Sequence, residues 1–204
     1  ALGKEAALFC PSGVMANQIA VRVHTRPGDE VICEAQCHTY INETGGLAAL
    51  SGVQVKPLRG VRGLPRYEDI LGAVQEEDVH HPRTRALLLE NTHNYAGGCV
   101  LDRAETQRIA LALKARGIAC HLDGARLGNA AVAGGVTMAE LAEPFDTVTL
   151  CLSKGLGAPV GSMLASSSAF IGEARRIRKM FGGGMRQAGI LAAAGLIALS
   201  DGLA

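Results

Sequence analysis

Short aliphatic runs alternate with segments of helical periodicity along the whole chain, and this alternation constrains the fold more than any other feature. The aliphatic runs predict strands at residues 6–10, 30–35, 53–57, 85–90, 118–123, 147–152 and 159–165. Helical spacing of apolar residues predicts a helix that begins at Ser12, and further helices at 41–50, 66–74, 102–116, 137–143, 169–180 and 185–199. This order predicts an α/β fold of three layers (α/β/α), in which helices cover both faces of a mainly parallel, mixed sheet.

The composition is that of one domain with an aliphatic core. Hydrophobic residues make up 48% of the 204 residues, whereas aromatic residues make up 3%, and 26 glycines allow many tight turns. No internal repeat or low-complexity linker divides the chain, so we expect a single domain over residues 1–204. The chain starts at Ala1 rather than at Met and stops at Ala204 just after a helical pattern, and we expect it to lack segments at both ends.

Charge and hydropathy exclude several classes of protein. Twenty Lys and Arg residues against nineteen Asp and Glu give a net charge of +1, without the basic excess that nucleic-acid binding requires. No apolar run reaches the roughly 18 residues of a membrane span. The longest, residues 190–199, is interrupted by Gly195, and no secretory signal opens the chain. We therefore expect neither a nucleic-acid partner nor a membrane partner.

The cysteines predict buried reduced thiols in a cytoplasmic protein. Four of the six lie in or beside strand-like runs: Cys10, Cys33, Cys120 and Cys151. The spacing of Cys33, Cys37 and His38 is the only one that suggests zinc, but a second pair of ligands is missing. We therefore expect no metal site.

Polar residues that directly follow predicted strands are the candidate functional residues, because ligands of parallel sheets bind at the carboxyl ends of the strands. Lys154 follows such a strand and stands in a glycine-rich turn. A partly buried lysine is a good nucleophile toward carbonyls, since burial disfavours the ammonium form. The alternative is a solvated loop lysine. The glycines do not form a dinucleotide-binding fingerprint, and Pro159 stands where that motif needs a helix.

A carboxylate and a helix start offer two further ligand contacts. Asp123 ends a predicted strand and is followed by two small residues and Arg126. Its carboxylate is suited to hold a protonated ring nitrogen, to bind a metal or to pair with Arg126. The turn at Ser12 opens a helix, whose free N–H groups at Gly13 and Val14 favour a phosphate; the alternative is an ordinary helix cap.

Two histidines and an arginine complete the candidates. His38 follows a predicted strand, where a lone histidine is more often structural than catalytic. His93 lies in a polar cluster after an aliphatic strand, which fits a functional and a structural role equally. Arg186 follows three glycines that permit close approach of a ligand to the backbone. The remaining histidines are expected at the surface (His24, His80 and His81) or packed within a strand (His121).

Six short motifs follow one another along nearly the whole chain. They are PSGxMANQ at 11–18, His38 with ExGG at 43–46, ENTHN at 90–94 with GG at 97–98, HxDGAR at 121–126, CLSKGL at 151–156 with PVGS at 159–162, and GGGMRQ at 182–187. Each motif alone is weak, but the six in this order resemble the large domain of threonine aldolases. These belong to the β-eliminating lyase group of fold-type-I pyridoxal-phosphate enzymes, so the resemblance implies a fold-type-I large domain that binds pyridoxal 5′-phosphate.

The resemblance assigns cofactor contacts to the candidates. Lys154 corresponds to the lysine that holds pyridoxal 5′-phosphate covalently, Asp123 to the partner of its ring nitrogen, and His38 to the imidazole stacked on its ring. Gly13 and Val14 correspond to the cradle of its phosphate. The family pattern usually has Thr at the position of Val14, so this chain lacks one hydroxyl donor to the phosphate.

The resemblance also implies a reaction and its substrate contacts. The reaction is the cleavage of threonine, allo-threonine or a related β-hydroxy-α-amino acid to glycine and an aldehyde. Arg126 corresponds to a ligand of the substrate carboxylate, His93 to a catalytic residue near the β-hydroxyl, and Arg186 to a residue near the phosphate. The family forms homodimers or homotetramers, and a smaller carboxy-terminal domain contributes to its substrate pocket.

Other readings of the sequence stay open beside this one. The first is another β-eliminating lyase or a racemase on the same fold. The second is a catalytically impaired remnant that binds cofactor or acts only as a binding module. The third is a nicotinamide-dependent oxidoreductase, which the missing fingerprint disfavours.

Overall fold

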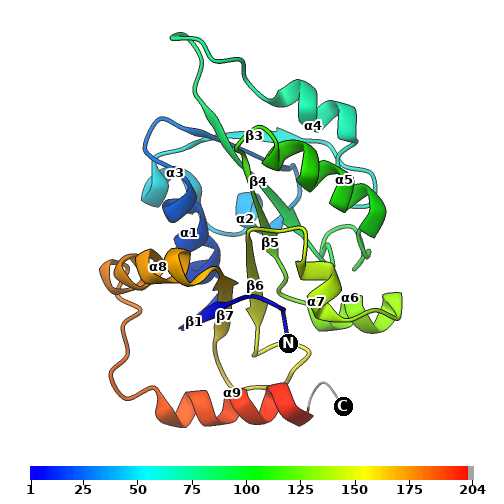
Figure 1. The fold of residues 1–204 in the computed structure, drawn as a ribbon. Helices are drawn as coiled ribbons and strands as arrows, with labels where there is room; N and C mark the ends of the chain where they lie inside the picture. Colours follow the sequence, from blue (N-terminus) through cyan, green and yellow to red (C-terminus); the bar gives the residue numbers. More distant parts are fainter. Residues whose placement is uncertain (202–204) are drawn as a thin grey trace.

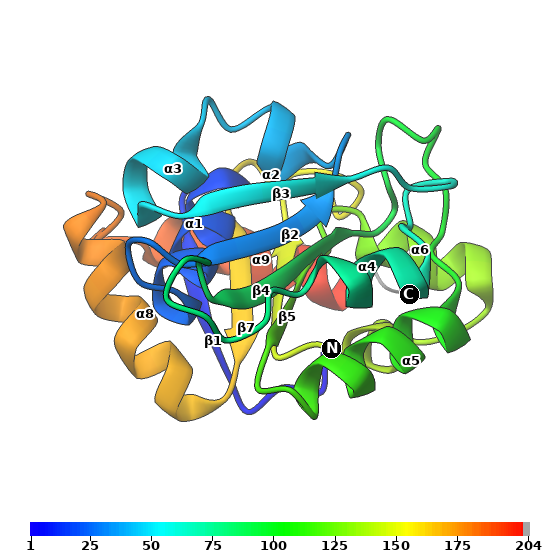
Figure 2. The same ribbon diagram turned by 90° about the horizontal axis from the view of Figure 1, so that it is seen from above.

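The computed structural model describes residues 1–201, which build one seven-stranded sheet with helices packed on it (Figures 1 and 2). The strands lie in the order β1-β7-β6-β5-β4-β2-β3. Their bounds are β1 Ala6–Cys10, β2 Glu30–Glu34, β3 Gln54–Leu58, β4 Thr84–Glu90, β5 Ala119–Asp123, β6 Thr147–Cys151 and β7 Ser162–Ser166. Strands β2 to β6 pair in parallel, whereas β7 is antiparallel to both of its neighbours. The predicted mainly parallel, mixed sheet is confirmed.

Helices cover both faces of the sheet, so the predicted three layers are confirmed as well. Their bounds are α1 Gly13–His24, α2 His38–Ile41, α3 Gly46–Ser51, α4 Tyr67–Ala73, α5 Arg103–Lys114, α6 Leu127–Gly134, α7 Met138–Ala142, α8 Ser168–Met180 and α9 Gly189–Asp201. Helices α1, α3 and α8 pack on one face, and α4 to α7 pack on the other (Figure 1). Residues 202–204 of the expected domain lie outside the described residues.

The alternation of side chains along β5 and β6 decides which residues face α1. Leu122 of β5 and Leu150 of β6 belong to the apolar cluster under α5, α6 and α7. Because successive side chains of a strand point to opposite faces, the residues between them face α1 instead. These are His121, Asp123, Thr147, Thr149 and Cys151. All five are buried, so the α1 face of these two strands is a buried polar layer.

Two predicted elements have wrong bounds, and one helix was not predicted. The predicted helix at residues 41–50 is divided into α2 and α3, because Thr44 and Gly45 adopt left-handed backbone angles with φ of 54° and 70°. Helix α6 has no counterpart among the predicted helices, because it is a short run of small residues directly after a loop. Strand β7 begins at Ser162 rather than at residue 159, because the preceding residues form the loop that follows β6.

Helix α9 is not the buried helix that its composition predicts. Ile190, Leu196 and Ile197 are 85%, 69% and 62% exposed. Only the side that carries Ala198 and Leu199 packs, against the loop after β6. An all-apolar sequence has no polar face to mark the exposed side, which explains the error. None of the described helices has the length and apolar character needed to cross a membrane.

Two residues of α5 test how far the core determines stability. Ile109 is 1% exposed within the large apolar cluster, whereas Leu111 on the same helix is 61% exposed. We predict that Ile109→Ala lowers the free energy of unfolding by ~2–5 kcal/mol, since it leaves a cavity. Leu111→Ala changes it by less than ~0.5 kcal/mol. Urea unfolding followed by circular dichroism measures both, and equal losses would contradict this description of the core.

Candidate functional site

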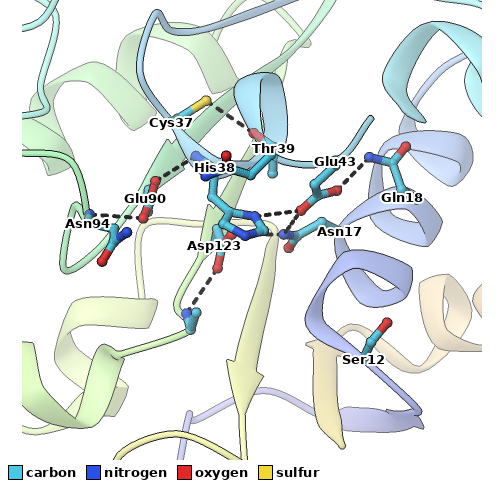
Figure 3. Close-up of polar contacts among 12 residues, drawn as sticks. Ser12, Asn17, Gln18, Cys37, His38, Thr39, Glu43, Glu90, Asn94 and Asp123 are labelled. Atoms are coloured by element: carbon cyan, nitrogen blue, oxygen red, sulfur yellow. Dashed lines mark hydrogen bonds and ion pairs between the residues drawn. The ribbon is translucent and has the colours of Figure 1, made fainter. Parts of the chain in front are cut away.

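Four parallel strands end at one edge of the sheet, and polar residues after them converge there (Figure 3). Strand β2 leads into α2, which begins at His38, while β4 and β5 end at Glu90 and Asp123. Strand β6 leads to Lys154, and α1 begins at the same edge with Gly13. The backbone N–H of His38 donates to Oε2 of Glu90 at 2.7 Å, which ties α2 to the end of β4.

Asp123 is the buried carboxylate at the centre of this edge. It is 3% exposed, and its Oδ2 accepts a hydrogen bond from Nδ2 of Asn17 at 2.8 Å. Its Oδ1 accepts from the backbone N–H of Ala125 at 3.0 Å. Burial, with the nearby charges of Glu90 and Glu43, raises the pKa of Asp123 to about 6, against the effect of these two hydrogen bonds. A cation beside this carboxylate would therefore bind strongly.

The imidazole of His38 lies beside Asp123 at the open side of the site (Figure 3). Its Nδ1 lies 3.1 Å from Oε1 of Glu43, and 29% of its side chain is exposed. The hydrogen bond with Glu43 raises the pKa of His38, while partial burial opposes this shift. The ring is held by one edge and leaves its exposed part available to a ligand.

Glu43 and Asn17 are the two site residues that the sequence analysis did not select. Glu43 is buried and accepts hydrogen bonds from Nδ2 of Asn17 at 2.9 Å and from Nε2 of Gln18 at 2.7 Å. Asn17 and Gln18 are each 1% exposed on α1. Two adjacent amides among the apolar residues of the first half of α1 were the signal that could have revealed them.

The polar atoms of His38, Glu43 and Asp123 all lie within 4.8 Å of one another, a spacing that a metal ion can bridge. Both carboxylates already accept hydrogen bonds from Asn17, however. Cys33 and Cys37, the pair that suggested zinc, are buried without a disulfide, and Sγ of Cys37 lies 3.1 Å from Oγ1 of Thr39. The donor set therefore fits an organic cation better than a metal.

The start of α1 forms an anion cradle at the same edge. Ser12 caps the helix and accepts from the N–H of Met15 at 3.1 Å. The N–H groups of Gly13 and Val14 lie in the first turn, where a helix offers them no carbonyl acceptor. A Cβ at Gly13 would lie 2.9 Å from Sγ of Cys151, so only glycine fits between α1 and β6. Two free donors at the positive end of a helix are suited to a phosphate.

Lys154 lies on the turn that follows β6, but it is exposed, contrary to the partial burial that we predicted. A backbone hydrogen bond from the N–H of Gly157 to the carbonyl of Lys154 closes this turn. Within residues 1–201 the ammonium group makes no hydrogen bond or ion pair. The amine is thus free to react with a ligand that reaches this edge.

Arg126 follows Asp123 by three residues and lines an open cavity of about 890 Å³. The predicted alternative, an Asp123–Arg126 pair, is wrong, because the carboxylate is bonded to Asn17 and Ala125 instead. Arg126 is half-buried, and its guanidinium forms no ion pair with any described carboxylate. It can therefore bind the carboxylate of a small ligand in this cavity.

His93 occupies a more enclosed position than the other candidates. It is 1% exposed, and its Nε2 lies 2.9 Å from Oε2 of the buried Glu34. Its Nδ1 accepts from the N–H of Ala96 at 3.2 Å. The ring also packs directly against Gly63, where a Cβ would overlap it. Both ring nitrogens thus have protein partners.

Arg186 lies in the exposed loop between α8 and α9 and forms no hydrogen bond or ion pair within the described part of the chain. Gly183 of the same loop packs directly against Met15 in the first turn of α1. The loop therefore passes beside the anion cradle. The structure gives no direct contact between Arg186 and the other candidates.

Among the remaining histidines, three positions were predicted correctly and one was not. His80 and His81 are exposed and His121 is fully buried, as expected. His24 is half-buried instead of lying at the surface, because its ring packs on Phe170 with 4.6 Å between the ring centroids.

Comparison with known proteins assigns this arrangement to a family. The chain is 45% identical to low-specificity L-threonine aldolase 1 of Arabidopsis thaliana over 206 residues, which are 99% of this chain and 58% of that protein. It is 44% identical to the low-specificity L-threonine aldolase of Escherichia coli, covering 99% of this chain and 60% of that protein. A solved structure of Leishmania major threonine aldolase superposes with a TM-score of 0.87 at 26% identity, over 97% of this chain and 58% of that one.

The chain thus spans somewhat less than two thirds of the length of these relatives. The family model described as β-eliminating lyase matches all of residues 1–204. The predicted resemblance is confirmed, and the chain belongs to the β-eliminating lyase family.

Proposed function

We propose that this chain is the cofactor-binding domain of a pyridoxal-phosphate-dependent threonine aldolase. The substrate would be threonine, allo-threonine or a related β-hydroxy-α-amino acid, and the products glycine and an aldehyde. The observation that carries the proposal is the buried Asp123, bonded to Asn17 and placed beside His38 and the start of α1. The names and identities of the relatives support the substrate class.

The described residues fit this cofactor at three of its groups. The N–H groups of Gly13 and Val14 are suited to its phosphate. Asp123 is suited to its protonated ring nitrogen, because burial and the nearby carboxylates raise the pKa of that carboxyl and an adjacent cation would offset this cost of its ionisation. Lys154 offers an unpaired amine to its aldehyde. When bound, the cofactor supplies an electron-accepting ring for the pair released as the Cα–Cβ bond breaks.

The protein groups position the substrate around that ring. Arg126, which lines an open cavity beside α6, would bind the substrate carboxylate and so determine which bond at Cα is broken. His38, oriented by its hydrogen bond with Glu43, would cover one face of the ring. Arg186 would approach the phosphate from the loop whose Gly183 packs against Met15 in the first turn of α1.

His93 is the proposed base at the substrate β-hydroxyl. A proton on Nε2, directed to Glu34, leaves Nδ1 as the basic nitrogen. Nδ1 must then exchange its present donor, the N–H of Ala96, for the substrate hydroxyl. In this proposal Nδ1 accepts the proton, and its contact with Ala96 must open first.

The first test is whether Lys154 holds the cofactor. We predict a visible absorption band after the chain is mixed with pyridoxal 5′-phosphate and freed of excess, and no band for Lys154→Ala. Lys114→Ala, another exposed lysine but on the far side of the sheet, keeps the band. A band that survives in Lys154→Ala would overturn the assignment.

The products then separate the alternatives. With threonine, the proposed reaction releases glycine and acetaldehyde. Ammonia with a 2-oxo acid would identify another β-eliminating lyase, and loss of optical activity without cleavage would identify a racemase. A band without any product would favour a chain that binds cofactor without turnover.

Val14 provides a test of the anion cradle. Its side chain is 38% exposed at the start of α1, so a hydroxyl there can reach a phosphate without repacking the core. A hydrogen bond to a charged group contributes about 1.5–3 kcal/mol. We predict that Val14→Thr binds pyridoxal 5′-phosphate about 10- to 100-fold more tightly in a fluorescence titration, while Val14→Ala does not. Equal affinity of all three proteins would place the phosphate elsewhere.

We also propose a cytoplasmic homodimer or homotetramer. The exposed apolar side chains of α9 support association, and the buried, unpaired thiols support a reducing compartment. Light scattering coupled to size exclusion is expected to give two or four times the chain mass. A monomer mass at micromolar concentration would contradict the assembly, and a fluorescent fusion found only outside the cytoplasm would contradict the location.

A further inference from the structure

A line of buried polar side chains leads away from Asp123 between α1 and the sheet. Nδ2 of Asn17 bonds Asp123 at 2.8 Å, and Oδ1 of Asn17 lies 3.1 Å from Nε2 of His121. Nδ1 of His121 lies 2.9 Å from Oγ1 of Thr147, which lies 3.0 Å from Nε2 of His24. Asn17, His121 and Thr147 are 1%, 0% and 0% exposed.

The two carboxylates fix the direction of every bond in this line. Nδ2 of Asn17 faces both Asp123 and Glu43, which only accept when ionised, so Oδ1 must face His121. Nε2 of His121 therefore carries the proton. Burial lowers the pKa of His121 to about 3, so the ring is neutral and Nδ1 accepts from the Thr147 hydroxyl.

The same count of donors and acceptors sets the direction of the hydrogen bond at the outer end of the line. The Thr147 hydroxyl has one proton, which goes to His121, so its oxygen accepts from Nε2–H of His24. Burial lowers the pKa of His24 to about 4, against the opposing charge of Asp146 and with that of Arg85. His24 also lines a cavity of about 630 Å³ at the opposite edge of the sheet, so the line extends from that edge to the carboxyl ends of the strands.

In each of the four hydrogen bonds, the acceptor is thus the group nearer to Asp123. Hydrogen bonds joined head to tail polarise one another, so each donor strengthens the next. Every member is neutral, which lets the line stabilise a buried negative charge without supplying a counter-ion. The carboxylates of Glu43 and Glu90 oppose the charge of Asp123, and the imidazole of His38 interacts favourably with it.

We propose that Asn17, His121 and Thr147 are positioning residues for the aldol cleavage: they form a one-way hydrogen-bond chain that holds the Asp123 carboxylate oriented and ready to bind a protonated ring nitrogen. The link to catalysis rests on the proposed function. The chain of hydrogen bonds itself belongs to the cofactor-free protein, where it can be measured without any activity.

The first measurement is the ring tautomer of His121 in the 204-residue chain. Nitrogen-15 NMR at pH 7 distinguishes a protonated Nε2 from a protonated Nδ1, and His121→Gln assigns the signals. We predict a neutral ring with the proton on Nε2. A proton on Nδ1, or a charged ring, would reverse or break the line and overturn the proposal.

The second measurement is the titration of Asp123 in the cofactor-free chain, followed by carbon-13 NMR of its carboxyl and assigned with Asp123→Asn. We predict that Asn17→Ala raises the pKa of this carboxyl by about one unit, because it removes the direct donor. Thr147→Val, which keeps the shape and loses the hydroxyl, raises it by ~0.3–0.5 unit through the weakened line. Thr147→Ser restores the wild-type value.

Thr149→Val is the matched control for Thr147→Val. Thr149 lies two residues further along β6 on the same face, is 0% exposed, and its Oγ1 has no hydrogen-bond partner among the described residues. Thr149 stands opposite Asp123 in the β5–β6 register, so any effect of a lost hydroxyl that does not pass through the hydrogen-bond line would appear there. We predict that the pKa of Asp123 shifts less in Thr149→Val than in Thr147→Val. An equal shift in both threonine variants, or no shift in Thr147→Val and Asn17→Ala, would overturn the proposal.

Failure of this proposal can be distinguished from failure of the proposed function. If the chain binds no pyridoxal 5′-phosphate but shows the predicted tautomer and titrations, the hydrogen-bond line is supported and the proposed function is wrong. If the chain binds the cofactor through Lys154 but the variants leave the Asp123 titration unchanged, the proposed function is supported and the hydrogen-bond line is wrong. If a substituted chain fails to fold, the tautomer of the wild-type protein still decides.

Discussion

The burial of one negative charge, on Asp123, is the constraint around which the site is arranged. The carboxylate ends β5, the middle strand of seven, where helices on both sides exclude water. Burial and two neighbouring carboxylates oppose its ionisation. The protein offsets this only in part, with the donors Asn17 and Ala125. A positively charged ligand at this point would offset the remaining cost of ionising the buried carboxylate, so the cofactor-free site favours a cation.

The parallel sheet brings the other groups to the same place. Since β2, β4, β5 and β6 run in one direction, their following residues meet at one edge, together with the start of α1. An anion cradle, a buried carboxylate and an unpaired amine then lie along that edge. In the proposed function these three match the phosphate, ring nitrogen and aldehyde of one cofactor, and the family membership of the chain agrees with this match.

Local patterns in the sequence predicted the fold. The site was predicted less completely, because it also depends on contacts between residues that are far apart in the sequence. Strand periodicity located Asp123 and the residue after β2, His38, at the correct edge. It could not reveal that Asn17 and Glu43 contact each other, because they are far apart in sequence and join only when α1 packs beside the loop after α2. The exposure of Lys154 and of α9 depends on what packs against them, which no local pattern encodes. The assigned roles in catalysis stay predictions.

The most direct test of this account is the protonation state of the ring nitrogen of bound pyridoxal 5′-phosphate. Nitrogen-15 NMR of the ring-labelled cofactor on the wild-type chain at neutral pH measures it, with Asp123→Asn as the comparison. We predict a protonated nitrogen in the wild type and an unprotonated one in Asp123→Asn. An unprotonated nitrogen beside the wild-type carboxylate, or the same state in both proteins, would contradict it.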